Sequence, residues 1–423
     1  MIYQPRIVDA QLDDLIRMLP AVVLEGAKAV GKTATAERRA AETFSLDREN
    51  TRRTIMSDPS LVLRGRPPTL IDEWQRVPAV WDEVRYAVDH GDGAGRFLLA
   101  GSAQPSKAAN LHSGAGRMVS LTMRPMSLPE RAVEEPTISF SELLSGTRPA
   151  VEGATELGVG DYAELIVASG FPGICSAEAP ARPHLLNGYI RRIVEHDILA
   201  LGAGVRRPSA LLAWLAAYGA ATATTASYSN LLDAATPGVD AKPSKEAAAA
   251  YRDLLTRMWI LEPLPAWTPS FAHLRRLGQA PKHHLVDPAL AARLVGATVG
   301  SLVRGTSEPQ LRRDTTFLSA LFESLATQTV RVLAEPHMAA VSHLRMRGGE
   351  REIDLIVARD DLRVLAIEVK MGSDIGPRDV AHLHWLEGEL PGRVLDKVVL
   401  TAGRFAHRRP DGVAVVPLAL LGP

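Results

Sequence analysis

The sequence is poor in cysteine, and its single thiol belongs to Cys175. One cysteine cannot form an internal disulfide framework, so the composition excludes a disulfide-stapled secreted module. Residues 1–13 contain no apolar run of signal-peptide length. Both observations lead us to expect a cytoplasmic protein.

A net charge is also lacking, because 48 Lys and Arg residues balance 48 Asp and Glu residues. The whole molecule therefore exerts no long-range attraction on nucleic acid, and a nucleic-acid site would have to be a local basic patch. Aromatic residues, which stack on bases, make up only 5% of the chain. These two shortages argue against a strong nucleic-acid binder.

No long hydrophobic run is present either. Residues 208–232 carry no charge, but they are rich in Ala, Thr and Ser and are interrupted by Gly219 and Asn230. Because a membrane span needs about 20 mainly apolar residues, this segment predicts a buried helix and a second short helix, with no membrane association. With 423 residues and 46% apolar content, we expect a soluble globular protein of two or three domains.

What the sequence does contain is a glycine-bounded loop between an apolar run, Ala21–Glu25, and a helical segment, Ala34–Glu42. Strand, loop and helix in this order are the context in which Gly-x-x-x-x-Gly-Lys-Thr binds phosphate. The backbone N–H groups of such a loop form an anion nest at the start of the helix. The loop reads Gly26-Ala27-Lys28-Ala29-Val30-Gly31-Lys32-Thr33.

The residues of this phosphate loop predict its ligands. Gly26 and Gly31 allow the backbone to curl close to the phosphates. Lys32 supplies a positive charge for the β- and γ-phosphates, and Thr33 offers a hydroxyl to Mg²⁺. We therefore expect ATP and Mg²⁺ as cofactors.

Residues 1–135 alternate strand and helix signals, which predicts an α/β domain with a parallel sheet. Apolar residues at Val80, Val84 and Val88 have helical spacing and predict a helix over 78–89. The predicted strands are Ala21–Glu25, Thr43–Asp47, Thr69–Glu73, Arg96–Ser102 and Met118–Met123.

Two carboxylates, Asp72 and Glu73, end the third of these strands about 40 residues after the loop. Asp72 can reach the Mg²⁺ shell, and Glu73 can polarise the water that attacks the γ-phosphate. Ser102, at the end of the next strand, is a candidate to hold that water or to touch the γ-phosphate. Arg117 is either a charge that reaches a nucleotide or a surface arginine, and the sequence leaves both interpretations open.

These motifs, in this order and spacing, resemble the bacterial and archaeal AAA-type P-loop ATPases that are fused to a C-terminal domain of unknown function. The resemblance covers most of the chain and implies that the loop strand lies between the Ser102 strand and the Met118–Met123 strand. It also implies a ring or a dimer, since AAA-type modules commonly need a neighbour's charge. The matching motifs are Gly26–Thr33, Ile71–Pro78, Leu99–Ser102, Arg124–Glu130, Ser169–Pro172, Tyr189–Asp197 and Leu285–Pro288.

The composition beyond the ATPase domain changes twice. Residues 136–160 are rich in Gly, Pro and Thr and predict a linker. Residues 161–275 are mainly helical by composition, and the pattern of a helix followed by a short strand predicts a winged-helix-like region, which binds either DNA or a protein. The adjacent histidines His283 and His284 would point to opposite faces of a strand, so they make a poor pair of metal ligands.

Residues 276–423 contain two strand signals, Glu352–Ala358 and Arg363–Lys370. If their hairpin is symmetric about Asp361, Asp354 lies opposite Glu368, and period-two alternation places Lys370 on the same face. Two carboxylates and an ammonium in this arrangement fit metal-dependent phosphodiester cleavage.

The pattern resembles the restriction-endonuclease-like core of PD-(D/E)xK type, in which Glu323 matches the acidic residue of the first helix. Two other interpretations stay open. The strands could form an exposed hairpin stabilised by ion pairs, or a nuclease-like fold that serves for binding contacts and not for cleavage. Residues 301–423 carry 16 Lys and Arg against 16 Asp and Glu, so no basic field would hold a duplex there.

The sequence thus leads to two functional hypotheses. The first is an ATP-binding and ATP-hydrolysing protein that acts on DNA through its nuclease-like C-terminal domain. The second is a nucleotide-gated switch that binds a protein partner, in stress, defence or toxin-control circuitry, and cleaves nothing. A transport component ranks last, because no membrane feature supports it.

Overall fold

The computed structural model describes residues 3–91, 93–103, 117–198, 208–235, 244–268, 280–304, 312–346 and 348–423. The chain forms two compact units. The first comprises Met1–Pro125 and Asp253–Ile260, and the second comprises Met126–Arg252 and Leu261–Pro423. Both contain a sheet with helices packed on it, so the predicted α/β class is confirmed.

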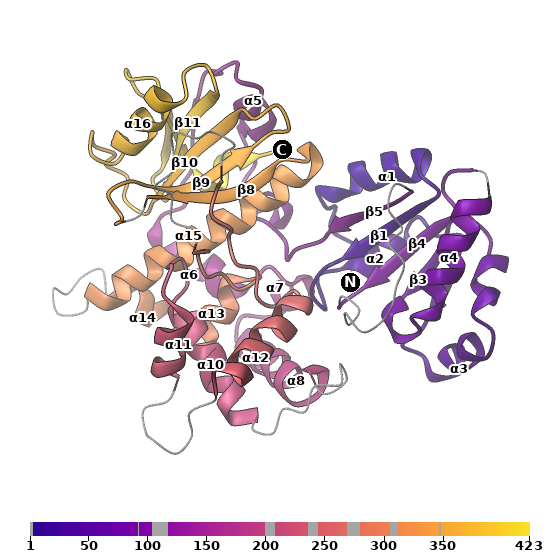
Figure 1. Ribbon diagram of the computed structural model, residues 1–423. Helices are drawn as coiled ribbons and strands as arrows, with labels where there is room; N and C mark the ends of the chain where they lie inside the picture. Colours follow the sequence, from indigo (N-terminus) through magenta and orange to yellow (C-terminus); the bar gives the residue numbers. More distant parts are fainter. Residues whose placement is uncertain are drawn as a thin grey trace. The chain divides into compact units, whose positions relative to one another are not determined.

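The first unit contains a five-stranded sheet with the order β2-β3-β4-β1-β5, all of whose paired strands run parallel (Figure 1). The strand that precedes the phosphate loop lies between β4 and β5, as the family resemblance implied. The strands are β1 (Ala21–Glu25), β2 (Glu42–Ser45), β3 (Thr69–Asp72), β4 (Phe97–Gly101) and β5 (Met118–Thr122).

One set of strand residues in this sheet packs against the helix that follows β3. Val23, Ile71 and Leu99 belong to a buried cluster that also contains Val80, Val84 and Val88 of the helix after β3. This apolar spacing fixes that helix on the sheet. The helices of the unit are α1 (Val8–Met18), α2 (Lys32–Glu37), α3 (Glu49–Ser57) and α4 (Ala79–His90), with 3₁₀ helices η1 (Pro59–Arg64) and η2 (Trp74–Arg76).

The helix predicted over Ala34–Glu42 is shorter in the structure and begins earlier, because α2 covers Lys32–Glu37 and Glu42 already starts β2. The parallel register brings the carboxyl ends of the strands to one edge, where Glu25 lies beside Gly101 and Asp72 beside Ala100. This edge is where open parallel sheets bind ligands. The phosphate loop, Glu73 and Ser102 follow directly after these strand ends.

Helices make up most of the second unit before residue 334. The uncharged segment over 208–232 forms a helix and then a second, shorter one, as predicted. The helices are α5 (Phe140–Ser145), α6 (Val159–Ala168), α7 (Pro172–Cys175), α8 (Arg182–Arg192) continued by a π-helical turn (Ile193–Asp197), α10 (Pro208–Ala220), α11 (Tyr228–Ala234), α12 (Lys245–Arg257), α13 (Pro288–Leu294), α14 (Val299–Arg304) and α15 (Arg312–Ala334).

The C-terminal part of this unit forms a seven-stranded sheet with the order β7-β12-β13-β11-β10-β9-β8 (Figure 1). Helix α15 packs against β8, β9 and β10, and α16 (Ala381–Glu389) packs against β9, β10 and β11. The strands are β7 (Gly153–Ala154), β8 (Ala340–Arg345), β9 (Glu352–Ala358), β10 (Val364–Lys370), β11 (Val394–Thr401), β12 (Phe405–Arg408) and β13 (Ala414–Pro417).

Residues 136–160, which composition predicts to be a linker, are built into this C-terminal fold. Strand β7 pairs with β12 at the edge of the large sheet, and β6 (Ile138–Ser139) pairs with β14 (Leu421–Gly422). The segment therefore closes one edge of the sheet.

Where the winged-helix-like pattern was predicted after α12, the described residues form isolated bridges. Leu261 pairs with Leu285 and Leu264 with Lys282, both antiparallel, and residues 269–279 between them lie outside the described ranges. These bridges fix the position of Lys282, because its N–H donates to Leu264 O at 3.0 Å and its carbonyl accepts from Leu264 N at 2.8 Å.

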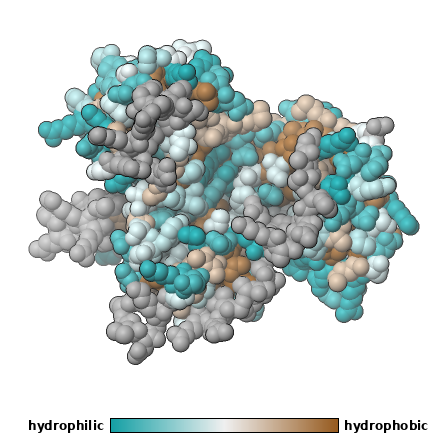
Figure 2. All heavy atoms as spheres, in the orientation of Figure 1, coloured by the Kyte–Doolittle hydropathy of each residue, from teal (hydrophilic) through white to brown (hydrophobic). Residues whose placement is uncertain are grey.

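Figure 2 shows hydrophilic residues over most of the face in view, with apolar residues in separate groups among them. Within the described ranges, no helix combines the length and the apolar character that crossing a bilayer would require.

Candidate functional site

The phosphate loop turns tightly between β1 and α2. Gly26 and Gly31 have φ values of 144° and 104°, which favour glycine, and Ala29 is left-handed with φ 65°. A Cβ on Gly26 would lie 2.0 Å from the carbonyl oxygen of Met123. The loop therefore approaches the end of β5 so closely that only glycine fits at its first position.

The Lys32 side chain folds back into this loop. Its ammonium donates to the carbonyl oxygens of Gly26 at 2.8 Å and Ala27 at 2.7 Å, and the residue is 5% exposed. Burial lowers the pKa of Lys32 to about 8, against the opposing effect of Glu73 and Asp72. A buried ammonium inside a ring of backbone groups is positioned to bind an anion.

Thr33 and Asp72 meet at the strand ends. The Thr33 hydroxyl donates to Asp72 Oδ1 at 2.9 Å. Burial raises the pKa of Asp72 to about 6, although the hydrogen bond from Thr33 acts in the opposite direction. A hydroxyl and a carboxylate side by side are the oxygen ligands that Mg²⁺ takes together with phosphate oxygens, so these residues fit that ion.

Glu73 has a left-handed backbone with φ 55°, and two side chains hold its carboxylate. Ser102 Oγ donates to Glu73 Oε2 at 2.9 Å, and Gln75 Nε2 donates to the same oxygen at 2.5 Å. Ser102 therefore contacts the carboxylate of Glu73, a role that the sequence did not predict. Gln75 was also missed, because a glutamine two residues after a carboxylate carries no signal of its own.

Arg6 is a further residue that sequence reasoning missed. Its guanidinium is buried and donates to Val30 O in the phosphate loop and to Arg124 O after β5, each at 2.7 Å. It thus ties the loop to the segment beyond the neighbouring strand.

Arg117 directly precedes β5, and its side chain reaches the C-terminal end of α4. Its guanidinium donates to the carbonyl oxygens of Val88 at 3.2 Å and Asp89 at 3.0 Å. These are carbonyls of the last helical turn, which basic side chains commonly satisfy. In its own chain, Arg117 therefore contacts a helix end.

The C-terminal carboxylates have the register that the sequence predicts. Strands β9 and β10 are paired as far as Ile367 and Leu355, and Glu368 and Asp354 are the next residues along the two strands. Lys370 Nζ lies 2.8 Å from Glu368 Oε2 and 3.9 Å from Asp354 Oδ2. Asp354, Glu368 and Lys370 therefore share one face.

Lys282, which the sequence analysis did not single out, enters the same cluster. Its ammonium lies 2.8 Å from Glu323 Oε1, 2.9 Å from Asp354 Oδ1 and 3.0 Å from Glu352 Oε1. The residue is 2% exposed. Glu323, which comes from α15, was predicted to join this cluster and does so through Lys282.

The surroundings of the two central carboxyls shift their pKa values in opposite directions. Although burial opposes it, the ammonium groups of Lys282 and Lys370 hold the pKa of Asp354 below its ordinary range. Burial and the charge of Asp354 raise the pKa of Glu368. Asp354 is therefore the more acidic of the two carboxyls.

The histidines beside Lys282 are separate, as predicted. His283 Nε2 contacts Ala226 O at 2.7 Å, whereas His284 Nδ1 contacts Ser324 Oγ at 3.2 Å. Among the residues that the structure describes, no group of three His, Cys, Asp or Glu has the geometry of a metal site.

A third histidine, His343, makes the stability of the protein depend on pH. It is fully buried, and burial lowers its pKa to about 4. Its ordinary pKa is about 6.5, so the unfolded chain takes up a proton below pH 6.5 that the folded chain excludes until about pH 4. The contribution of neutral His343 to the free energy of unfolding is complete above pH 6.5. It is lost as the pH falls from 6.5 to about 4, and the loss is about 2 kcal/mol at pH 5.

Thermal unfolding followed between pH 7.5 and 5 should therefore show a falling melting temperature. The variant His343→Gln should weaken this dependence, and the exposed His407→Gln should leave it unchanged. A melting temperature that rises on acidification, or an unchanged slope in His343→Gln, would contradict the prediction.

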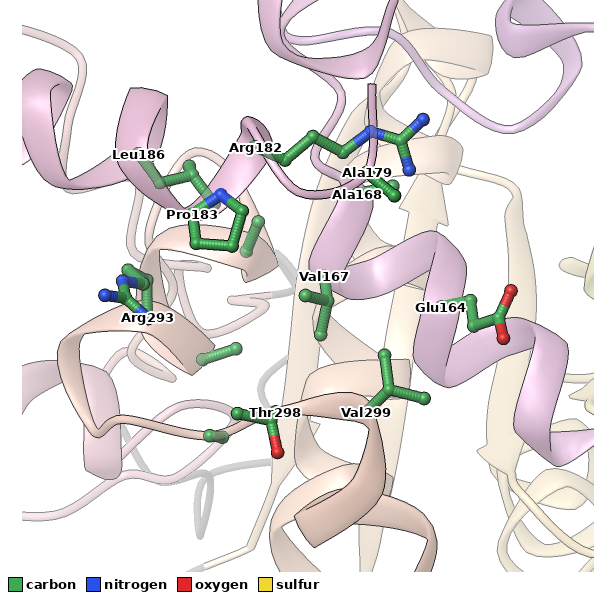
Figure 3. Close-up of a pocket in the computed structure, with 13 residues that line it drawn as sticks. Glu164, Val167, Ala168, Ala179, Arg182, Pro183, Leu186, Arg293, Thr298 and Val299 are labelled. Atoms are coloured by element: carbon green, nitrogen blue, oxygen red, sulfur yellow. The ribbon is translucent and has the colours of Figure 1, made fainter. Parts of the chain in front are cut away.

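The helical region contains a separate cavity of about 380 Å³. In Figure 3, Val167, Pro183 and Val299 surround its centre, whereas the charged ends of Glu164 and Arg182 lie at its edge. No residue of the phosphate loop and none of the C-terminal carboxylates lines it. It therefore does not coincide with any predicted site.

Three family models match successive parts of the chain. Residues 19–132 match an AAA domain. Residues 159–300 match a domain of unknown function (DUF8612), and residues 318–421 match another (DUF4143). The first match supports ATP binding and hydrolysis by a P-loop domain, and the other two assign no activity.

Two uncharacterized proteins, from Mycobacterium bovis and Mycobacterium tuberculosis, are each 29% identical over 310 residues, which cover 70% of this chain and 60% of the relative. The chain thus spans about 60% of the length of these curated relatives. A solved structure, the Walker-type ATPase PABY2304 of Pyrococcus abyssi, covers 68% of this chain and 94% of its own, with 14% identity and a TM-score of 0.37.

Proposed function

We propose that the N-terminal unit hydrolyses ATP to ADP and phosphate at the loop Gly26–Thr33. The observation that carries the proposal is the contact between Thr33 and Asp72, 2.9 Å apart, beside a buried Lys32 and next to Glu73. A hydroxyl, an acid at a strand end, a lysine in a backbone nest and an adjacent carboxylate are the components of P-loop hydrolysis. The AAA-domain match to residues 19–132 supports the same conclusion.

Each residue has a distinct role in this proposal. Lys32 exchanges its carbonyl partners for oxygens of the β- and γ-phosphates. Glu73 accepts a proton from the water that attacks the γ-phosphate. Ser102 and Gln75 hold the Glu73 carboxylate at 2.9 Å and 2.5 Å, so they act as positioning residues. When Mg²⁺ is bound, Thr33 and Asp72 hold it, and it neutralises charge on the phosphates.

Calorimetric titration of the full chain with ATP and Mg²⁺ tests this site directly. We expect saturable binding by the wild type and a weaker, magnesium-insensitive interaction in Asp72→Asn. Well-folded protein that takes up neither ATP nor GTP would exclude the proposal.

We further propose that ATP binding and hydrolysis control the binding of a protein partner and do not drive an action on DNA. The charge of the chain is balanced, with 48 basic and 48 acidic residues, and residues 301–423 are balanced as well. Without a basic field, a duplex would gain little from counterion release. A protein partner requires no such field.

Steady-state ATP turnover with and without double-stranded DNA separates the two hypotheses. We expect DNA to change the turnover of the wild type by less than twofold at about 0.15 M salt. Salt-sensitive stimulation by DNA would instead favour action on nucleic acid.

A further inference from the structure

The acidic cluster of the C-terminal fold surrounds a cation that belongs to the chain itself. One ammonium, Lys282 Nζ, has three carboxylate oxygens within hydrogen-bond distance: Glu323 Oε1 at 2.8 Å, Asp354 Oδ1 at 2.9 Å and Glu352 Oε1 at 3.0 Å. An ammonium has three donors. Lys282 therefore has as many carboxylate partners as it has N–H bonds.

This arrangement does not fit a divalent ion. Mg²⁺ and Ca²⁺ need several oxygen ligands at about 2.0–2.6 Å around one point. The point that Glu323, Glu352 and Asp354 share is occupied by Lys282 Nζ, and Lys282 is 2% exposed. A second ammonium, from Lys370, lies 2.8 Å from Glu368. Cations of the chain therefore contact both carboxylates of the predicted metal pair.

The position of Lys282 is also fixed by its backbone. It exchanges two hydrogen bonds with Leu264, and the His283 N–H donates to Thr224 O at 2.8 Å. These hydrogen bonds hold the backbone of Lys282 beside the cluster, and the residue is 2% exposed. The ammonium is therefore a constant part of the fold.

We propose that Lys282 is a built-in replacement for the divalent cation of a nuclease-like core, so that this part of the chain binds no divalent ion and cleaves no phosphodiester bond. The ammonium instead joins the segment around Lys282 to α15 and β9, which carry its partners. The inference concerns a part of the chain separate from the phosphate loop, and it holds whether or not that loop hydrolyses ATP.

The variant Lys282→Met tests the proposal, because methionine keeps much of the length of the side chain but not its charge. Three carboxylates then face one another without the ammonium that lies between them. In the full chain without nucleotide, we expect a melting temperature lowered by about 10 °C and partly restored by millimolar Mn²⁺ or Ca²⁺. The wild type and the exposed control Lys245→Met should show neither the loss nor the metal-dependent rise.

Electron paramagnetic resonance with Mn²⁺ gives a second measurement that needs no variant to fold. We expect no tight Mn²⁺ site in the nucleotide-free wild type and no nicking of plasmid with Mn²⁺ or Mg²⁺. A Mn²⁺ site, or nicking, that is present in the wild type and lost in Asp354→Asn would overturn the proposal. So would a Lys282→Met protein that is as stable as the wild type.

Discussion

Replacing Glu73 by Gln is expected to lower the turnover of ATP by about 10²–10⁴-fold while leaving ATP binding nearly intact. The amide cannot accept a proton from the attacking water, and a positioned general base contributes a rate effect of this size. The amide can still hydrogen-bond to Ser102, whose Oγ lies 2.9 Å from the carboxylate. The substitution therefore changes the chemistry and preserves most of the local structure.

Single-turnover measurements with calorimetry of ATP binding would separate the two effects. Glu37→Gln, on the exposed side of α2, is the matched control and should hydrolyse ATP normally. Unchanged turnover in Glu73→Gln would remove Glu73 from the mechanism. Equal losses of binding and turnover would instead show that its charge holds the nucleotide.

Replacing Lys32 by Ala is expected to weaken ATP binding by about 10²-fold or more and so to abolish turnover at ordinary ATP concentrations. A hydrogen bond to a charged group contributes about 1.5–3 kcal/mol, and each 1.4 kcal/mol is a factor of ten. Lys32 is also the buried ammonium inside the loop, 5% exposed.

The variant Lys32→Ala also removes hydrogen bonds within the loop, so its stability must be measured as well as its ATP affinity. The carbonyl oxygens of Gly26 and Ala27 lose the donor that lies 2.8 Å and 2.7 Å away. Thermal unfolding of Lys32→Ala should show whether the loop tolerates that loss. The exposed Lys245→Ala is the control for removing a lysine. ATP affinity retained by folded Lys32→Ala would place the nucleotide elsewhere.

The parts of the fold that the sequence predicts well are those whose cause is local. The strand, loop and helix around Gly26–Thr33 follow from neighbouring residues, because two glycines allow the turn and the flanking apolar run fills a buried strand. The register of β9 and β10, which brings Asp354 and Glu368 to one face, was also predictable, since a short hairpin turn at Asp361 fixes it. In both places, the residues that determine the geometry lie within about 15 positions of one another.

Two of the residues that were missed depend on contacts between distant parts of the chain. Lys282 meets Asp354 across 72 residues, and Arg6 meets Arg124 across 118. A lone lysine or arginine in a sequence has no periodicity that reveals its partner. The same limit applies to Gly153–Ala154, whose strand character exists only because β12 lies beside it.

The pairing of β7 with the edge of the C-terminal sheet has a consequence for biosynthesis. Arg408 donates to Pro149 O across 259 residues of chain. At a synthesis rate of about 5–20 residues per second, the segment that contains β7 is made about 10–50 s before its partner strand β12. The parallel sheet of the first unit is complete once Thr122 has been made, so this sheet can form while the strands of the C-terminal sheet are still being made.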